Sequence, residues 1–353
     1  PTRRFLKLLG WFVLCFPFHL PRSTSAAMRI LLTTTSYQDT PGKHHDVLKA
    51  SGFEVVGARG PLPEAEMLKL ITQTGGVDGL LNGDDEITAK VIDAALAART
   101  PLKVIAKYGI GLDSIDVKHA TAKKIPVLFT PGVNHTTVAE HAIGLMIGIS
   151  KHFWHHLSGV KAGEWKKIRK TGNELAGKTL GVLGMGRIGK EVIKRAAAFD
   201  MSAIAYDVYW DDAFAQQYNV IKAASMEEVL KVADVITLHL PATDETRHFI
   251  DAKRIAMCKD GVVIINTARG TLIDEAAVAE ACKSGKMGGY GGDVLEKEPM
   301  VTPHPFQKID NILLTPHVGS RTYESVERQA LRATHNIVNF LNGDKDFIQA
   351  NEF

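Results

Sequence analysis

Three polar residues stand just after three successive apolar runs of the sequence. Arg269 follows VVIINTA, Glu298 ends GGYGGDVLEKE and His317 follows ILLTP. An arginine can hold a carboxylate in a bidentate pair and polarise the neighbouring carbonyl, whereas an imidazole passes protons near neutral pH. A carboxylate beside that imidazole orients it and favours its protonated form. We therefore expect these three residues to be catalytic, in reversible hydride transfer between a 2-hydroxy acid and a 2-oxo acid.

A glycine-rich motif predicts the site of the cofactor. The run TLGVL at 179–183 leads into GMGRIG at 184–189 and then into a helix-forming stretch. Such glycines permit a tight turn, close approach of a pyrophosphate and close helix packing, and the amides of Arg187 and Ile188 would face the anion. Asp207 ends the next strand-like run, where a carboxylate binds both ribose hydroxyls and repels a 2′-phosphate, so the cofactor should be NAD. The glycines concerned are Gly184, Gly186 and Gly189.

From Met28 onward, short β-branched runs alternate with longer amphipathic stretches, which is typical of parallel α/β sheets. The ligands of such sheets bind at the carboxyl ends of the strands, where the polar residues above are expected to meet. Helices are predicted at His44–Ala50, Glu64–Thr72, Thr88–Ala98, about Thr137 to Leu157 and about Tyr323 to Leu341. Strands are predicted at 29–33, 53–57, 78–82, 102–107, 126–130, 179–183, 202–206, 234–239, 262–266, 288–292 and 312–315.

The composition excludes several classes of protein. The chain has 353 residues, of which 45% are hydrophobic and 23% charged, enough for two globular domains. Its net charge of +3 is too small for a nucleic-acid footprint. Three cysteines without metal or disulfide spacing exclude a zinc module, indicate a reducing compartment and leave no metal site to expect. We therefore expect a cytoplasmic protein without stable membrane association.

Residues 1–27 differ from the rest of the chain. They contain a basic start, the apolar run at 5–20 and the small residues Ser25-Ala26-Ala27, as in a leader or secretory signal. One interpretation is a translated leader before a true start at Met28, and the alternative is a genuine export signal. In either case we expect this segment to lie outside the fold.

With these motifs in view, the sequence from Met28 to its end resembles the D-isomer-specific 2-hydroxyacid dehydrogenases, the family of phosphoglycerate dehydrogenase and glyoxylate/hydroxypyruvate reductase. The resemblance includes KYGIGLDSIDV (107–117), TPGVNHTTVAEHAIGLM (130–146) and LHLPATDET (238–246), besides the motifs around the three catalytic candidates. It implies that substrate carboxylates meet the amides of Gly109, Ile110 and Gly111 as well as Arg269. It also implies further cofactor contacts from His239, Pro241, Thr246, Thr267, Ala268 and Asp293.

The resemblance also implies an interrupted layout and a homodimer. Residues 28–128 and 320–353 would form a flavodoxin-like substrate domain, and residues 129–319 would form a Rossmann-like NAD-binding domain inserted into it. The fold class expected is therefore α/β with two parallel-sheet domains. The long helix and the loop up to Trp165 are similar to the dimerisation arm of the family.

The substrate side chain is the main open question. Phosphoglycerate dehydrogenases typically carry an arginine where Asn82 stands, and three acids follow here, which disfavours a phosphorylated substrate without excluding it, since Lys107 or a partner subunit could supply positive charge. Formate dehydrogenase is a second possibility within the fold, but its catalytic histidine pairs with glutamine, whereas Glu298 stands here. A third is an NAD(H)-sensing corepressor-like protein, which turnover would distinguish from an enzyme.

Overall fold

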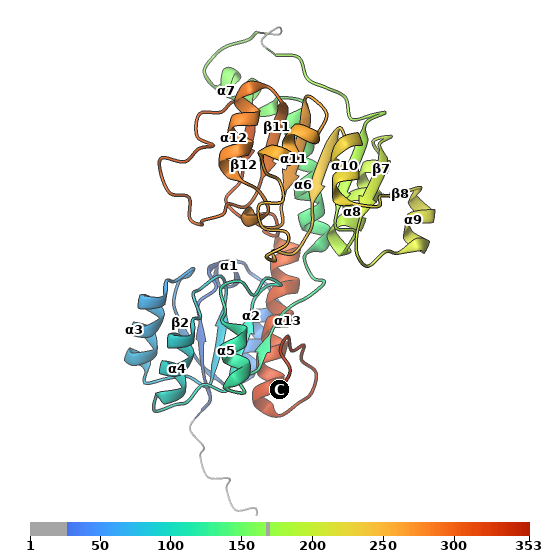
Figure 1. Ribbon diagram of the computed structural model, residues 1–353. Coiled ribbons are helices and arrows are strands. Elements are labelled where there is room, and N and C mark those ends of the chain that lie inside the picture. The colour runs from blue at the N-terminus through green and yellow to red at the C-terminus, as the bar shows by residue number, and fades with distance from the viewer. Residues whose placement is uncertain (1–26, 167–169) are drawn as a thin grey trace, which may run out of the picture.

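The computed structural model describes residues 27–166 and 170–353, so residues 1–26 of the predicted leader lie outside the described residues. The chain forms two lobes, each built on a parallel sheet with helices on both faces (Figure 1). In the first lobe the strand order is β2-β1-β3-β4-β5, which is the flavodoxin-like order. Its strands are β1 (Arg29–Leu32), β2 (Glu54–Gly57), β3 (Gly79–Asn82), β4 (Val104–Lys107) and β5 (Val127–Leu128).

The second lobe holds a seven-stranded sheet in the order β12-β11-β10-β9-β6-β7-β8. The order reverses between β6 and β9, and this reversal is the switch point at which doubly wound sheets bind ligands. The sequence predicts every one of these strands except the short β8. The strands are β6 (Thr179–Leu183), β7 (Ser202–Tyr206), β8 (Ile221–Lys222), β9 (Val235–Leu238), β10 (Val262–Asn266), β11 (Met287–Gly292) and β12 (Ile312–Leu314).

Helices connect the strands and cover the sheets. In the part of the chain that the structure describes, none of them combines the length and the apolar character needed to cross a membrane. The helices of the first lobe are α1 (Thr35–Asp39), α2 (Lys43–Ala50), α3 (Glu64–Thr74), α4 (Ala89–Ala97) and α5 (Val117–Ala122). Those that follow are α6 (His135–Ser150), α7 (Phe153–Lys161), α8 (Arg187–Ala197), α9 (Asp212–Tyr218), α10 (Met226–Val232), α11 (Ala252–Met257), α12 (Glu275–Ser284) and α13 (Tyr323–Asn342), with a 3₁₀ turn at Gly270–Leu272.

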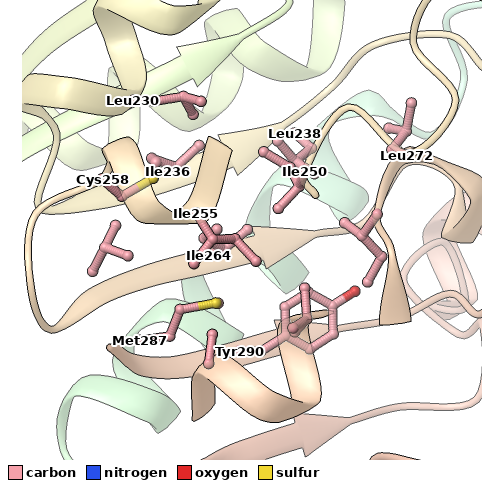
Figure 2. Close-up of a cluster of buried hydrophobic side chains, with 14 of the residues drawn as sticks. Leu230, Ile236, Leu238, Ile250, Ile255, Cys258, Ile264, Leu272, Met287 and Tyr290 are labelled. Carbon is pink, nitrogen blue, oxygen red and sulfur yellow. The ribbon is translucent and has the colours of Figure 1, made fainter. Parts of the chain in front are cut away.

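The second lobe shows why the strands are so apolar. Both faces of its sheet are covered, so that inward side chains on either side must be hydrophobic. On one face Ile236, Ile264 and Tyr290 pack with side chains of α10, α11 and α12 (Figure 2). The helices are bounded by local signals; α12, for example, begins where the Asp274 carboxylate accepts two backbone N–H groups and ends at Gly285 with φ +81°.

The end of the chain returns to the first lobe. Helix α13 packs against α2, β3 and β4, and the segment after it runs beside β5. There the Ala350 amide donates to the Val127 carbonyl at 2.8 Å, and the Asn351 side chain accepts from the Val127 amide at 2.8 Å. The first lobe is therefore built from both ends of the described chain, and the second lobe is an insertion between them.

One predicted element is wrong. The sequence suggests a single helix from about Thr137 to Leu157, but α6 ends at Ser150 and α7 begins at Phe153. Between them His152 has φ +51°, which is a left-handed conformation that a right-handed helix does not accommodate. The apolar periodicity continues across this residue, which is why the pattern alone suggests one helix.

Candidate active site

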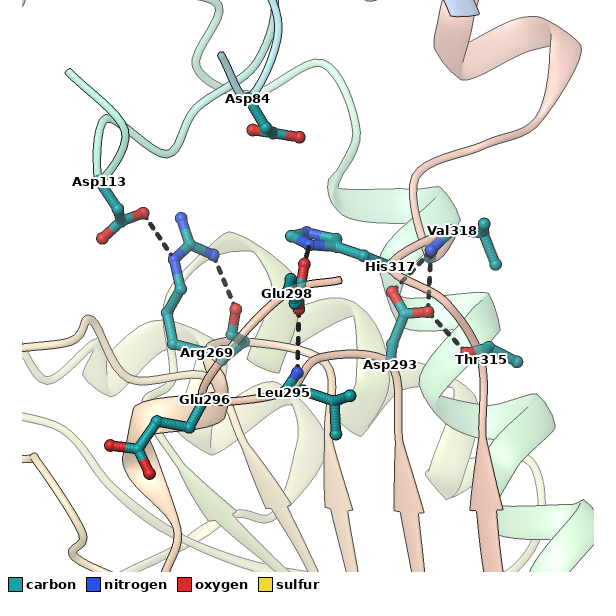
Figure 3. A network of polar contacts seen from close by, with 12 residues as sticks. Asp84, Asp113, Arg269, Asp293, Leu295, Glu296, Glu298, Thr315, His317 and Val318 are labelled. Atoms are coloured by element: carbon teal, nitrogen blue, oxygen red, sulfur yellow. Dashed lines mark hydrogen bonds and ion pairs between the residues drawn. The ribbon is translucent and has the colours of Figure 1, made fainter. Parts of the chain in front are cut away.

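A cleft of about 540 Å³ lies between the two lobes and receives side chains from both. Arg269, Glu298 and His317 enter it from the loops after β10, β11 and β12, which are neighbouring strands of the second sheet (Figure 3). The loop 109–111, after β4, lines the opposite wall. The structure thus brings together the three predicted catalytic residues and the predicted substrate loop.

His317 and Glu298 form a pair. The imidazole Nδ1 lies 2.7 Å from Glu298 Oε2, and Glu298 Oε1 accepts the Leu295 amide at 2.9 Å, so the carboxylate is held in place on its own loop. The hydrogen bond from Glu298 and its negative charge raise the pKa of His317, against the opposing effect of burial. With Nδ1 engaged, Nε2 is the nitrogen left to exchange a proton with a ligand.

Arg269 reaches across the cleft to the first lobe. Its Nε donates to Asp113 Oδ2 at 2.8 Å, and its Nη1 donates to the Ala268 carbonyl at 2.7 Å. Asp113 is 60% exposed, so this ion pair between the lobes is worth little, roughly 0–1 kcal/mol, and a carboxylate ligand can replace it. Gly111 faces the same guanidinium, because a Cβ on Gly111 would lie 2.0 Å from Arg269 Nη2.

The substrate loop is only partly available for binding. Gly109 has φ +137°, and its amide donates to Thr130 Oγ1 at 3.1 Å, while its carbonyl accepts the Thr130 amide at 2.9 Å. The Gly109 amide is therefore already used to fix the loop to the end of β5. Ile110 and Gly111 are the predicted loop residues that remain to present amides to a ligand.

Asp293 holds the turn that carries His317. Its side chain is 3% exposed, and it accepts hydrogen bonds from Thr315 Oγ1 at 2.6 Å, from the Val318 amide at 2.9 Å and from the Gly319 amide at 2.7 Å. Burial alone would raise the pKa of Asp293, but these donors, together with His141, lower it. The predicted contact with a nicotinamide is untested, and the structure adds a role in organising the 315–319 turn.

The glycine motif fits a dinucleotide. An added Cβ on Gly189 would lie 2.1 Å from the Gly184 carbonyl, and one on Gly184, where φ is +96°, would lie 2.6 Å from the His239 carbonyl. At Gly186 an added Cβ would meet no heavy atom of the described residues within 4 Å, so this glycine borders open space. Helix α8 begins at the next residue, Arg187, and its first amides face that space.

The acid predicted to read the ribose lies beside this motif. Asp207 follows β7 and accepts the Met185 amide at 2.6 Å and the Tyr209 amide at 2.7 Å, which ties it to the glycine turn. Thr267 Oγ1 is buried and has no hydrogen-bond partner among the described residues, as expected of a group that awaits a ligand. Together with the open space at Gly186, these features match a bound dinucleotide.

The remaining predicted cofactor residues lie on the β9 and β10 loops. Burial lowers the pKa of His239 to about 3, so its ring is neutral. Thr246 uses its hydroxyl to bind the Pro241 carbonyl at 2.7 Å, which closes the 241–246 loop upon itself. Ala268 lies between Thr267 and Arg269, and its carbonyl accepts the arginine Nη1.

Asn82, which stands where phosphoglycerate dehydrogenases typically carry an arginine, is buried rather than open to the cleft. Its side chain is fully buried in β3, a strand covered on both faces; its Nδ2 donates to the Gly83 carbonyl at 3.0 Å, and it is not among the residues that line the cleft. The Asn82 side chain itself therefore offers no contact to a substrate phosphate. Asp84 and Lys107 do line the cleft, and they are joined by an ion pair of 2.6 Å.

Several contributors to the site were not predicted. Asp113 holds Arg269, and Thr130 fixes the substrate loop. His141 of α6, which the sequence pattern suggested as a member of the apolar face, lies 2.8 Å from Thr315 Oγ1 through its Nε2. Its position about two turns into a helix that follows a proline-glycine hinge is the only sequence signal that could have indicated this contact.

Comparison with known proteins agrees with this site. Residues 143–319 match the family model of the D-isomer specific 2-hydroxyacid dehydrogenase NAD-binding domain. The chain is 41% identical to the hydroxypyruvate reductase of Thermotoga maritima over 279 residues, 78% of this chain and 88% of that enzyme. It is 38% identical to the D-3-phosphoglycerate dehydrogenase of Methanocaldococcus jannaschii over 90% of this chain and 58% of that longer enzyme.

A solved structure supports the cofactor. The D-lactate dehydrogenase of Aquifex aeolicus, in complex with NAD and lactic acid, superposes with a TM-score of 0.77 at 28% identity, over 89% of this chain and 96% of that one. The fold, the glycine turn with Asp207 and these relatives agree on NAD as the cofactor and on a two-domain Rossmann-like enzyme. The chain belongs to the D-isomer-specific 2-hydroxyacid dehydrogenases, a family of NAD-dependent oxidoreductases.

Proposed function

We propose that the protein reduces small, unphosphorylated 2-oxo acids of the glyoxylate or hydroxypyruvate type with NADH. The observation that carries this proposal is the meeting of Arg269, the His317–Glu298 pair and the Gly111 loop in one cleft. The likeness to a hydroxypyruvate reductase supports it, while the likeness to phosphoglycerate dehydrogenases keeps 3-phosphoglycerate as the alternative. The carboxylate of Asp84 in the cleft favours the unphosphorylated acid, because it repels a phosphate.

The proposed mechanism assigns one task to each side chain. Arg269 exchanges Asp113 for the substrate carboxylate and polarises the adjacent carbonyl, while the amides of Ile110 and Gly111 bind the same carboxylate from the other lobe. His317 donates a proton from Nε2 to the carbonyl oxygen, and Glu298 stabilises the imidazolium that makes this donation possible. Bound NADH supplies the hydride that reduces the carbonyl carbon.

The cofactor would be held along the carboxyl edge of the second sheet. The amides at the start of α8 would bind its pyrophosphate, and Asp207 would accept from the ribose hydroxyls. Thr267 would supply its unpaired hydroxyl near the ring. The other predicted contacts, at His239, Pro241, Thr246, Ala268 and Asp293, border the same edge.

We assign residues 28–128 and 320–353 to a substrate domain and residues 129–319 to an NAD-binding domain. The packing of α13 on β3 and β4 supports this division. The Arg269–Asp113 pair joins the two domains across the cleft, so that a change in their separation would alter the site directly.

We also propose that the protein is a homodimer formed through α7. Large apolar side chains on this helix and the loop after it are exposed, which is unusual for a monomer. A substitution such as Trp154→Glu should convert the dimer to a monomer in sedimentation experiments, whereas a monomeric native protein would exclude this assembly. The side chains concerned are Phe153, Trp154, Leu157, Val160 and Trp165, between 49% and 81% exposed.

A cytoplasmic location completes the proposal. Cys258 and Cys282 are free and buried, which suits a compartment in which thiols stay reduced. Burial raises the pKa of Cys258 to about 11 and that of Cys282 to about 12, so neither thiol is reactive. Fractionation of cells that express the native chain would locate it.

The test of the activity is NADH oxidation by the purified full chain with glyoxylate, hydroxypyruvate, pyruvate and 3-phosphohydroxypyruvate. We expect turnover with glyoxylate or hydroxypyruvate, and little when NADPH replaces NADH. A clear preference for the phosphorylated acid would instead identify a phosphoglycerate dehydrogenase. Tight NADH binding without turnover of any of the four acids would identify a sensor and refute the enzyme.

A further inference from the structure

Lys107 is a buried cation at the edge of the cleft. It is the last residue of β4, its side chain is 3% exposed, and its Nζ donates to the Gly83 carbonyl and to Asp84 Oδ1, each at 2.6 Å. An ammonium group has three donors, so one remains for a ligand. Because Lys107 is almost completely buried, its charge requires Asp84 as a partner.

Asp84 presents the other half of this pair to the cleft. Its side chain is 72% exposed, and it lies across from Arg269 and His317 (Figure 3). Partial desolvation by the protein around the cleft would raise the pKa of Asp84, but the attraction and hydrogen bond of Lys107, with smaller contributions from His317 and Arg269, lower it. The carboxylate is therefore ionised, and its Oδ2 is free to accept a hydrogen bond from a ligand, since Lys107 binds Oδ1.

If the substrate binds as proposed, its side chain can face only one wall of the cleft. The carbon that carries the reacting carbonyl has three substituents besides the incoming hydride: its carboxylate, which Arg269 and Gly111 hold, its oxygen, which faces His317, and a side chain. With the first two directions taken by the second lobe and the loop, the side chain points to the remaining wall of the cleft. Asp84 and Lys107 belong to the polar lining of the cleft, together with residues such as Tyr108 and Arg321.

We propose that the Lys107–Asp84 pair selects a substrate with a neutral hydroxyl on the carbon next to the carbonyl, as in hydroxypyruvate or a longer hydroxylated 2-oxo acid. This inference rests on the proposed function and makes it specific. A hydroxyl donates to Asp84 Oδ2 and accepts the third proton of Lys107, so it satisfies both partners at once. A methyl group has neither a donor nor an acceptor, and a phosphate dianion has no donor, so neither satisfies both partners.

The same pair rejects the two closest analogues. A phosphate dianion at this position has no proton to donate to Asp84 Oδ2, and it would meet the exposed Asp84 carboxylate before the buried Lys107 ammonium. A methyl group, as in pyruvate, would remove water from both charged groups and give them no partner, and sites built for a hydroxyl discriminate strongly against its absence.

The experiment compares kcat/KM values of native protein and variants for hydroxypyruvate, pyruvate and 3-phosphohydroxypyruvate. Each value is divided by that of the same variant for glyoxylate, which has no further carbon and so never reaches the pair. For native protein we expect a hydroxypyruvate to pyruvate ratio of about 10 or more. Asp84→Asn keeps the size of the side chain and removes its charge.

For Asp84→Asn we expect opposite changes. The normalised value for hydroxypyruvate should fall by about tenfold, and that for 3-phosphohydroxypyruvate should rise by about tenfold, because the repulsion is gone and Lys107 is released. Lys107→Met should lower the normalised kcat/KM values for both hydroxypyruvate and 3-phosphohydroxypyruvate. Asp260→Asn, which removes another lysine-paired aspartate outside the cleft, is the matched control and should leave all normalised values unchanged.

The outcomes separate this inference from the proposed function. If Asp84→Asn lowers all normalised values alike, or leaves them unchanged, the pair does not select the hydroxyl, although the reductase activity stands. A native preference for 3-phosphohydroxypyruvate would also overturn the inference. If native protein reduces none of the four acids, the proposed function fails and the inference fails with it.

Discussion

The role of Arg269 gives the most direct test of the mechanism. In the structure its Nε donates a hydrogen bond to Asp113 and its Nη1 donates one to the Ala268 carbonyl, while its Nη2 faces Gly111. Binding a substrate carboxylate through Nε and Nη2 requires only the loss of the exposed Asp113 pair, at a cost of roughly 0–1 kcal/mol. It forms two charge-assisted hydrogen bonds, each worth about 1.5–3 kcal/mol.

These magnitudes predict the effect of two substitutions. Arg269→Ala removes both bonds, about 3–6 kcal/mol, so kcat/KM for the 2-oxo acid should fall by about 10²- to 10⁴-fold. Arg269→Lys retains a point charge that supports one bond, and its loss should be about 10- to 100-fold. The difference between the two variants measures the bidentate geometry rather than the charge alone.

The assay is the initial rate of NADH oxidation with glyoxylate, accompanied by NADH binding followed through its fluorescence. Both variants should bind NADH as native protein does, because the guanidinium contacts the substrate rather than the glycine turn. Arg254→Ala is a matched control, since Arg254 pairs with Glu227 and Asp251 outside the cleft. If Arg269→Ala stayed within about threefold of native kcat/KM, the reasoning on this residue would be refuted.

Three further changes have distinct signatures. Glu298→Gln removes the charge that raises the pKa of His317, so the imidazolium is lost at lower pH and the alkaline limb of the reduction profile should move to lower pH; an unmoved limb would exclude the pairing. Asp207→Ala should lower kcat/KM with NADH by about tenfold and raise that with NADPH, and an unchanged ratio of the two would contradict its role at the ribose. Gly111→Ala places a Cβ 2.0 Å from Arg269 Nη2. Because a flexible side chain can move away, melting temperature should change little while kcat/KM falls strongly, and a fall in both would indicate a general packing defect instead.

The sequence predicts the fold well because its signals are local. Runs of β-branched residues mark strands buried on both faces, and Gly184 and Gly189 lie where a Cβ would strike backbone, so their identity specifies the turn. The catalytic candidates are found in the same way, since each follows directly after a recognisable strand. The parallel arrangement then determines that they share one edge of the sheet.

The features that could not be predicted depend on contacts between distant segments. Arg269 and Asp113 are separated by 156 positions, and nothing near either residue indicates the pair. The Gly109 amide looks available in the motif, yet Thr130 uses it. The burial of Asn82 is likewise not visible in the sequence, because a residue at the end of a strand can point into the core or toward the ligand, and only the packed structure of β3 decides which.

The position of His317 shows why an extra buried carboxylate is needed at this site. His317 has φ +52°, a left-handed conformation that costs a non-glycine residue roughly 1–2 kcal/mol and that is kept only where the surroundings impose it. Asp293 stabilises this left-handed conformation through two groups. Its backbone carbonyl accepts the His317 amide at 2.8 Å, and its side chain accepts the amides of Val318 and Gly319. Glu298 then has only to orient a ring whose backbone is already fixed. Asp293 therefore fixes the backbone of the histidine and adds a smaller effect on its pKa, whereas Glu298 binds the ring directly, so neither acid can replace the other.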